Sequence, residues 1–314
     1  MDSKTLKTTG LVEQHIHGAF GVDLATCTNP DDVVYLAQEL SKIGVTIFFP
    51  TLVTDSIENL KKQIEIIKKA KANQPKNSAL IAGIHLEGPF INPEKKGIHN
   101  KSLILEPSIK SFKELEDDII KIVTIAPELD KNDELCKYLK AKGIKVSAGH
   151  SLTTDLSCAN QVTHLFNAMG TVDHKKSSTA TLALTNDDIY TEIIADSVHV
   201  NNEVLKLIFK IKPKDKVLLI SDALPISHSN NKTMVFCSET IYLKDKKATD
   251  ANGTLAGSAM LLPDIIKNVV NNELLSFEEA IKMASTNQLK YHNLKNNCDI
   301  FWNENLEVVD FKFN

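Results

Sequence analysis

Residues 79–90, ALIAGIHLEGPF, predict a buried strand that ends at an acidic residue. The apolar run Ala79–Leu86 has the length of a strand, and Glu87 follows it directly. The same order of an apolar run, a polar side chain and an amphipathic segment recurs along the chain. The candidate strands are Leu11–His17, Val45–Leu52, Ala79–Leu86, Ile119–Ile125, Ile144–Gly149, Val162–Phe166, Tyr190–Ala195 and Val217–Ser221. Strands that alternate with helices in this way predict an α/β fold, a (β/α)8 TIM-like barrel.

Helices are expected between most of these strands. The clearest is Asp31–Lys42, because Asn29 is a good capping residue and Pro30 suits the first helical turn. The other helical patterns are Ser56–Ala72, Asp130–Lys142 and Asn201–Ile211.

The pattern changes after the last of these strands, where a β excursion, two helices and two terminal strands are expected. These elements are a strand at Met234–Leu243, a turn at 250–253, helices near Leu261–Asn271 and Ser276–Ser285, and strands at Cys298–Trp302 and Leu306–Phe313. We therefore expect a barrel domain over residues 10–290 and a short C-terminal β tail over residues 291–314.

Composition and charge narrow the class of protein. The net charge of −4 gives no basic surface of the kind that binds nucleic acid. The five cysteines are widely spread and include no close pair, which argues against a disulfide framework and suits a reducing cytoplasm. No run of about 18 apolar residues is present, so a membrane span is not expected.

Chemically active side chains fall at the ends of the predicted strands, where barrel enzymes build their active sites. His15 and His17 are two residues apart on the first strand, so both imidazoles lie on one face. The other groups of this kind are Glu87, His150, His164, His199 and Asp222. A lone histidine pair or a lone carboxylate is usually incidental. This set together predicts a site for zinc or a similar divalent metal ion.

Asp222 has a distinct role available in such a site. A carboxylate beside a metal-activated water takes its proton as a general base and returns it to a leaving amine. The metal lowers the pKa of the water and polarises a carbonyl group. The residues thus predict hydrolysis of an amide or a related bond.

Several segments resemble the N-acetylglucosamine-6-phosphate deacetylase family of the amidohydrolase superfamily. They are HIHGAFGVD (15–23), HLEGPFINPEKKGIH (85–99), SAGHS (147–151), THLFNAM (163–169), IADSVHV (194–200), LISDAL (219–224) and GTLAGSA (253–259). The resemblance runs from about Gly10 to Asn287, and HLEGPFINPEKKG and THLFNAM are its most specific parts. It implies a cytoplasmic, homodimeric hydrolase that removes the acetyl group from an amino-sugar phosphate.

The resemblance also implies which residues bind metal. Glu87, His150 and His164 match the principal ligands, while His15 and His17 match the pair that adds a second metal in some members. One or two ions per chain are therefore expected, with Glu87 bridging them. Zinc is the favoured metal, with iron, manganese or cobalt as alternatives.

Catalytic and substrate-binding roles carry over in the same way. Asp222 matches the catalytic acid/base and a contact of the second metal, and His99 matches the histidine that polarises the acetamido carbonyl. The matched substrate contacts are Ile98, His99, Asn167, Ala168, His199, Leu255, Ala256 and Gly257.

Two features depart from the family pattern. The run DHKKSS (173–178) stands where the family has an arginine that grips the phosphate, and Lys175 takes that place by spacing. Lysine neutralises a phosphate but lacks the bidentate fork of arginine. Family members also begin with a few dozen residues that form part of a small β-sandwich. The tail would keep two strands of it, and we expect it to pack on the barrel or on a partner subunit.

Three alternatives stay open. An amidohydrolase acting on a cyclic amide often has a carboxylated lysine at the end of the fourth strand, but Thr124–Glu128 contains no lysine. A deacetylase for the galactosamine phosphate epimer is a second alternative, because the 173–178 loop differs. The third is a non-catalytic sugar-phosphate-binding relative, against which the intact Asp222 argues.

Three other histidines are interpreted as structural. His85 precedes Glu87 by two residues, and we favour a hydrogen-bonded core role over metal ligation. His228 and His292 lie in polar segments and are expected to face solvent.

Overall fold

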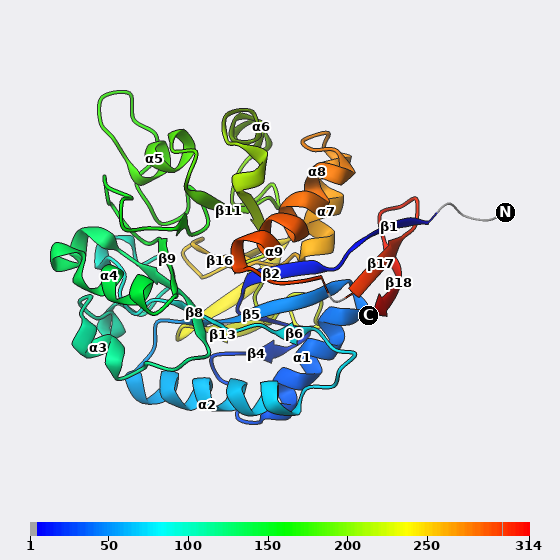
Figure 1. The fold of residues 1–314 in the computed structure, drawn as a ribbon, viewed down its shortest axis with the longest axis horizontal. Coiled ribbons are helices and arrows are strands. Elements are labelled where there is room, and N and C mark those ends of the chain that lie inside the picture. The colour runs from blue at the N-terminus through cyan, green and yellow to red at the C-terminus, as the bar shows by residue number, and fades with distance from the viewer. Residues whose placement is uncertain (1–4, 297) are drawn as a thin grey trace.

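The computed structural model describes residues 5–296 and 298–314. Its core is a barrel of parallel strands with helices around it (Figure 1). The strands are β2 (Leu11–Ile16), β5 (Val45–Val53), β7 (Ile84–Glu87), β8 (Ile120–Ile125), β9 (Lys145–Ala148), β10 (Gln161–Val162), β11 (Tyr190–Ile194) and β12 (Val217–Ile220). The first and last strands meet through the bridge from Ile16 to Ala223, and Asp222 N donates to His15 O at 2.9 Å. The predicted barrel fold is confirmed.

The helices pack one apolar face against the strands. In α1 the buried positions Val33, Leu36, Ala37 and Leu40 repeat at helical spacing, and the Asn29 side chain accepts a hydrogen bond from Asp31 N as a cap. The helices are α1 (Pro30–Lys42), α2 (Ile57–Asn73), α3 (Ile109–Lys113), α4 (Glu134–Ala141), α5 (Thr179–Thr185), α6 (Asn202–Ile211), α7 (Leu262–Asn271), α8 (Phe277–Ile281) and α9 (Asn287–His292).

Several predicted elements are shorter than the sequence pattern indicates. The predicted strand 162–166 is reduced to β10, and His164 and Phe166 beyond it have positive φ angles of 28° and 75°. The predicted strand 79–86 divides into β6 (Leu80–Ile81) and β7, and Gly83 lies between them. A Cβ on Gly83 would come within 2.8 Å of Ile119 O, so the backbone there requires glycine. The predicted helix 130–142 begins only at Glu134, because Asn132 and Asp133 are left-handed, with φ of 56° and 55°.

The segment after the barrel is a hairpin sheet, and the prediction of one strand over 234–243 is wrong. Cys237 and Ser238 both have positive φ, 51° and 70°, and form a two-residue turn between two strands. The turn shifts the alternation by one residue, from Met234 and Phe236 on the first strand to Ile241 and Leu243 on the second. The sheet contains β13 (Thr233–Phe236), β14 (Glu239–Lys244), β15 (Lys247–Thr249) and β16 (Leu255–Ser258).

The two predicted strands of the tail are confirmed, and they form a three-stranded sheet with an N-terminal strand that the sequence did not indicate. The strand β1 (Leu6–Thr9) pairs antiparallel with β17 (Cys298–Trp302), which also pairs with β18 (Val308–Phe313). Figure 1 shows this sheet at one end of the barrel. Trp302 is fully buried, its ring centroid 5.4 Å from that of Phe277, so the tail does pack on the barrel. The domain boundary at residue 290 stays a prediction.

His292 is not solvent-exposed, so that prediction is wrong. Its Nε2 lies 2.7 Å from Gln14 Oε1, its ring stacks at 4.4 Å on Phe49, and burial lowers its pKa to about 3. His228 is exposed as expected. Every helix within the described residues is too short or too polar to cross a membrane.

Candidate active site

A cavity of about 310 Å³ lies where the barrel strands end. Its walls include most of the strand-end residues that the sequence singled out. These are His17, Glu87, His150, His164, His199 and Asp222. His15 lies beneath the cavity as a fully buried residue.

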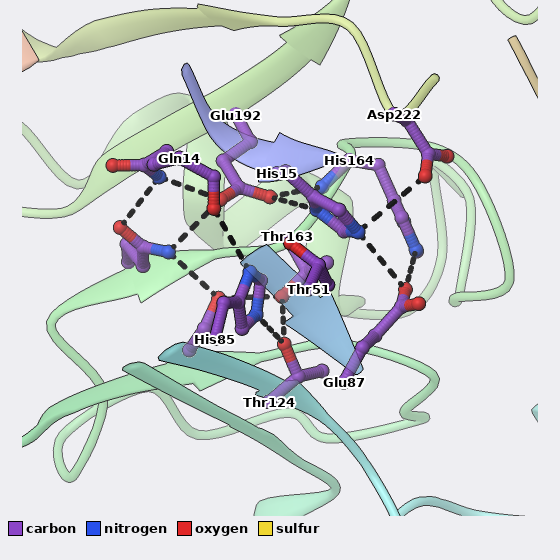
Figure 2. Close-up of polar contacts among 12 residues, drawn as sticks. Gln14, His15, Thr51, His85, Glu87, Thr124, Thr163, His164, Glu192 and Asp222 are labelled. Atoms are coloured by element: carbon purple, nitrogen blue, oxygen red, sulfur yellow. Dashed lines mark hydrogen bonds and ion pairs between the residues drawn. The ribbon is translucent and has the colours of Figure 1, made fainter. Parts of the chain in front are cut away.

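Glu87 is the centre of the site (Figure 2). Its Oε1 atom lies 3.1 Å from His150 Nε2 and 2.8 Å from His164 Nε2. Its Oε2 atom lies 3.3 Å from His17 Nε2 and 3.4 Å from His99 Nε2. Burial alone would raise the pKa of Glu87, but the neighbouring histidines, His15 first, hold it well below its usual range. The carboxylate is therefore ionised.

Asp222 joins the histidine pair of the first strand to this centre. Its Oδ1 atom lies 3.0 Å from His17 Nε2 and 3.4 Å from His15 Nε2. Burial opposes ionisation of Asp222, but His15 and His17 lower its pKa below the ordinary value. Two groups of potential ligands result, and the atoms of each lie within 4.8 Å of one another: Glu87, His150 and His164; and His15, His17 and Asp222.

The hydrogen bonds of the imidazoles show that these groups fit a metal ion. The Nδ1 atoms of His17 and His150 face the carbonyl oxygens of Thr51 and Lys95, at 3.3 and 2.7 Å, so each must donate. In the neutral ring of His150 the Nε2 lone pair then faces a carboxylate. Burial opposes protonation of His17, but Asp222 and Glu87 raise its pKa to about 9, which favours a proton or a metal ion at its Nε2. Burial holds the pKa of His150 at about 4, which keeps that ring neutral. Lone pairs that face carboxylates repel unless a cation lies between them, and histidine with carboxylate is a zinc-type ligand set.

His15 completes the same arrangement. Its Nδ1 lies 3.1 Å from the Glu192 carboxylate, and its buried Nε2 has no hydrogen-bond partner among the described residues. A buried nitrogen without a partner is costly unless a proton or a metal occupies it.

His99 and His199 present polar groups from the cavity wall. Thr54 N donates to His99 Nδ1 at 3.3 Å, so neutral His99 carries its proton on Nε2, on the side of Glu87. His199 Nδ1 lies 2.8 Å from Asp196 Oδ2. Burial opposes protonation of His199, but Asp196 raises its pKa.

Several strand-end residues have left-handed backbones. The φ angles are 47° at His150, 28° at His164 and 52° at Asp222. Residues other than glycine rarely adopt such conformations, which concentrate at functional sites. The backbone strain lies at the same positions as the candidate ligands.

The structure brings most of the predicted substrate contacts into the cavity but leaves one outside. The predicted residues that line it are Ile98, His99, Asn167, Ala168, His199, Leu255, Ala256 and Gly257. Lys175 does not line it and lies on an exposed loop over residues 171–177.

Sequence reasoning missed some residues of the site. Lys95 and Phe236 line the cavity, and Thr54, Asp196 and Glu192 hold catalytic-site histidines in place. Only Glu192 carried a signal, as a charged residue within the apolar run of β11.

The chain matches known proteins along most of its length. The model of the amidohydrolase family matches residues 6–298. A curated relative from Haemophilus influenzae, named N-acetylglucosamine-6-phosphate deacetylase, is 33% identical over 289 residues, which cover 88% of this chain and 74% of the relative. A relative from Escherichia coli O157:H7, named N-acetylgalactosamine-6-phosphate deacetylase, is 27% identical over 285 residues, 87% of this chain and 74% of the relative.

The fold of the chain is also similar to that of a solved structure. The crystal structure of N-acetylglucosamine-6-phosphate deacetylase from Thermotoga maritima superimposes with a TM-score of 0.90 at 28% identity, covering 99% of this chain and 88% of that one. With the cavity, its ligand groups and these matches in view, the chain belongs to the amidohydrolase family.

Proposed function

We propose that the chain is a metal-dependent hydrolase that converts N-acetylglucosamine 6-phosphate and water to glucosamine 6-phosphate and acetate. The observation that carries the proposal is the meeting of Asp222 with two groups of metal-type ligands in one buried cavity. The names of the relatives support the substrate.

Zinc is the proposed metal, because imidazole and carboxylate ligands suit it, with iron, manganese or cobalt as alternatives. Glu87, His150 and His164 would hold one ion, and His15, His17 and Asp222 a second. When bound, the metal would lower the pKa of a water molecule and polarise the acetamido carbonyl.

Asp222 is the proposed general base and acid. Its lowered pKa keeps the carboxylate ionised at neutral pH, so it accepts a proton from the attacking water. As the carbon–nitrogen bond breaks, the same carboxyl group returns that proton to the sugar nitrogen, which leaves as an amine. The water supplies the new oxygen of acetate.

His99 is the second proposed catalytic residue. The Thr54 hydrogen bond to Nδ1 leaves the proton on Nε2, which can donate to the acetamido oxygen as negative charge develops there. The proposed sugar contacts come from the cavity wall: Ile98, Asn167, Ala168, His199, Leu255, Ala256 and Gly257.

A cationic side chain that contacts the phosphate would be a lysine or a histidine, because all 36 Lys/Arg positions of the chain are lysines. We propose Lys175 as the phosphate contact. It lies on an exposed loop, so the loop would have to approach the substrate, or a neighbouring subunit would have to offer the same loop. We further propose a homodimer, which rests on the family resemblance. We also propose a cytoplasmic location, which is supported by the free cysteines.

N-Acetylgalactosamine 6-phosphate is the second candidate substrate. The relative of that name supports it, at a lower identity of 27%. The two sugars differ at one hydroxyl, so a change in a cavity contact would suffice to alter the preference.

The reaction is tested in water enriched in oxygen-18. Hydrolysis predicts acetate with one labelled oxygen and an equal amount of free amine. Acetyl transfer to another acceptor, without labelled acetate, would contradict the proposal.

A further inference from the structure

Glu192 lies beside His15, on the side opposite Asp222 and Glu87 (Figure 2). It comes from the middle of β11 and is fully buried. Its Oε2 atom lies 3.1 Å from His15 Nδ1 and accepts a hydrogen bond from His164 N at 3.2 Å. One carboxylate oxygen therefore contacts a residue from each of the two ligand groups.

The other oxygen of Glu192 is held by two amides. Oε1 accepts from Gln14 Nε2 at 2.5 Å and from Gln161 Nε2 at 3.1 Å. Apart from His15 Nδ1, the groups that contact the two oxygens are all donors: His164 N, Gln14 Nε2 and Gln161 Nε2. An ionised carboxylate in these surroundings accepts on all sides, so His15 Nδ1 is its donor.

The orientation of Gln14 is fixed in turn by His292. Gln14 Oε1 faces His292 Nε2 at 2.7 Å, which turns the amide nitrogen of Gln14 toward Glu192 and Gln161. Glu192 is thus held by a hydrogen-bond network whose parts come from β2, β10 and α9.

We propose that Glu192 is a positioning residue that sets the affinity of the second metal site. By accepting a hydrogen bond from His15 Nδ1 it turns the Nε2 lone pair toward Asp222 and Glu87, at 3.4 and 3.6 Å. A carboxylate that accepts from the far nitrogen of a ligating histidine fixes the tautomer and raises the basicity of the ring. The inference rests on the metal dependence proposed above.

A direct metal contact of Glu192 is a weaker explanation of the same geometry. Glu192 groups with His15 and His85 as potential ligands. Both nitrogens of His85 are already used, since Nδ1 lies 3.1 Å from Gln14 O and Nε2 lies 2.8 Å from Thr124 Oγ1. His85 thus has the hydrogen-bonded core role that the sequence favoured. The group of His15, His85 and Glu192 therefore has no free ligand atom on His85.

The test uses zinc titration of metal-free protein, with Glu13→Gln as a matched control. Glu13 is also buried beside His15, but its carboxyl oxygens accept from the backbone nitrogens of His15 and Ser221 and do not touch the imidazole. We expect Glu192→Gln to weaken the second zinc equivalent by about 10- to 100-fold and to leave the first unchanged. Glu13→Gln, which leaves the imidazole hydrogen bond of His15 in place, should weaken the second equivalent much less than Glu192→Gln does.

A second variant and a second readout keep the test decisive. Glu192→Asp keeps the charge but withdraws it from Nδ1, so it should also weaken the second equivalent. Thermal unfolding in excess chelator measures the stability of each variant without metal. The zinc titrations are compared among the variants that fold as the wild type does. Glu192 variants that bind two equivalents like Glu13→Gln would overturn the inference. A Glu192 variant that binds neither zinc equivalent, and that is also less stable than the wild type in chelator, would show a merely structural role. That result would overturn the inference too.

The outcome separates this inference from the proposed function. A wild type that binds one equivalent would overturn the role of Glu192 and leave the hydrolysis standing. A wild type that binds two equivalents, weakened as expected in Glu192→Gln, yet releases no acetate would overturn the hydrolysis alone.

Discussion

The Oδ1 atom of Asp222 lies 3.0 Å from the Nε2 atom of His17. The two residues follow β12 and β2, the last and first strands of the barrel, so closure of the barrel brings them together. The backbone of Asp222 also donates to His15 O at 2.9 Å. The proposed base is therefore positioned by the same contacts that close the fold.

Asp222→Asn should lower kcat by about 10²- to 10⁴-fold, the usual contribution of a general base. Asparagine preserves the shape of the side chain but cannot take the proton of the attacking water. Acetate release under saturating substrate measures the effect, with Asp264→Asn, which touches His228 away from the cavity, as the control. Activity of Asp222→Asn within tenfold of the wild type would rule out the assigned role.

Lys175→Ala should raise KM for the phosphorylated substrate about tenfold or more, as expected for loss of a hydrogen bond between charged groups. The kcat should change little, because the phosphate is remote from the bond that breaks. Lys176→Ala removes the neighbouring charge and is the matched control. If KM of Lys175→Ala equals that of Lys176→Ala and the wild type, another group binds the phosphate.

Lys212 should make stability depend on pH in the alkaline range. It is buried at the end of α6, where Nζ donates to Ala183 O at 2.7 Å and Asn186 O at 2.6 Å. Burial lowers its pKa from 10.5 to about 8. Between these values the unfolded chain binds more protons at Lys212 than the folded chain. The free energy of unfolding therefore increases as the pH rises.

Denaturant unfolding of the wild type and Lys212→Met from pH 7 to 10 measures this effect. The free energy of unfolding of the wild type, minus that of Lys212→Met, should increase as pH rises above about 8. Lys210→Met, at an exposed position of the same helix, controls for the loss of a lysine. A difference that stays constant or decreases as pH rises would contradict the lowered pKa of Lys212.

Trp302→Ala should lower the free energy of unfolding by about 3–5 kcal/mol, the usual cost of removing a large buried aromatic side chain. Its ring packs on Phe277, and Nε1 donates to Thr8 Oγ1 at 2.8 Å. Thr8→Val removes only that acceptor and should cost about 1 kcal/mol. Chemical denaturation measures both, and a Trp302→Ala variant as stable as the wild type would mean that the tail sheet is not part of the folded unit.

The sequence predicted the barrel and most of its site because both depend on local patterns. Each strand is a short apolar run, and each candidate metal ligand comes within a few residues of a strand end. Parallel strands in a barrel place those ends on one rim, which turns a linear list into a cluster. Glu87 and Asp222 could therefore be placed together although they lie far apart in the chain.

The features that sequence analysis missed depend on tertiary contacts. The strand β1 has the sequence LKTT and little apolar character, so only its pairing with β17 makes it a strand. His292 lies in a polar segment yet is half-buried, because α9 packs against β2 and β12 and its ring lies beside Phe49. Glu192 stood out in an apolar strand, but its contact with His15 requires closure of the barrel, which places β2 and β11 on either side of β12.

Acetate release from N-acetylglucosamine 6-phosphate is the most direct test of the proposed activity. The purified chain is assayed with zinc, after removal of zinc by a chelator, and after zinc is restored, with N-acetylgalactosamine 6-phosphate in parallel. We predict release with zinc, its loss on chelation and its return on restoration, with the glucosamine substrate preferred. A folded, zinc-loaded chain that releases no acetate from either sugar phosphate would contradict the account.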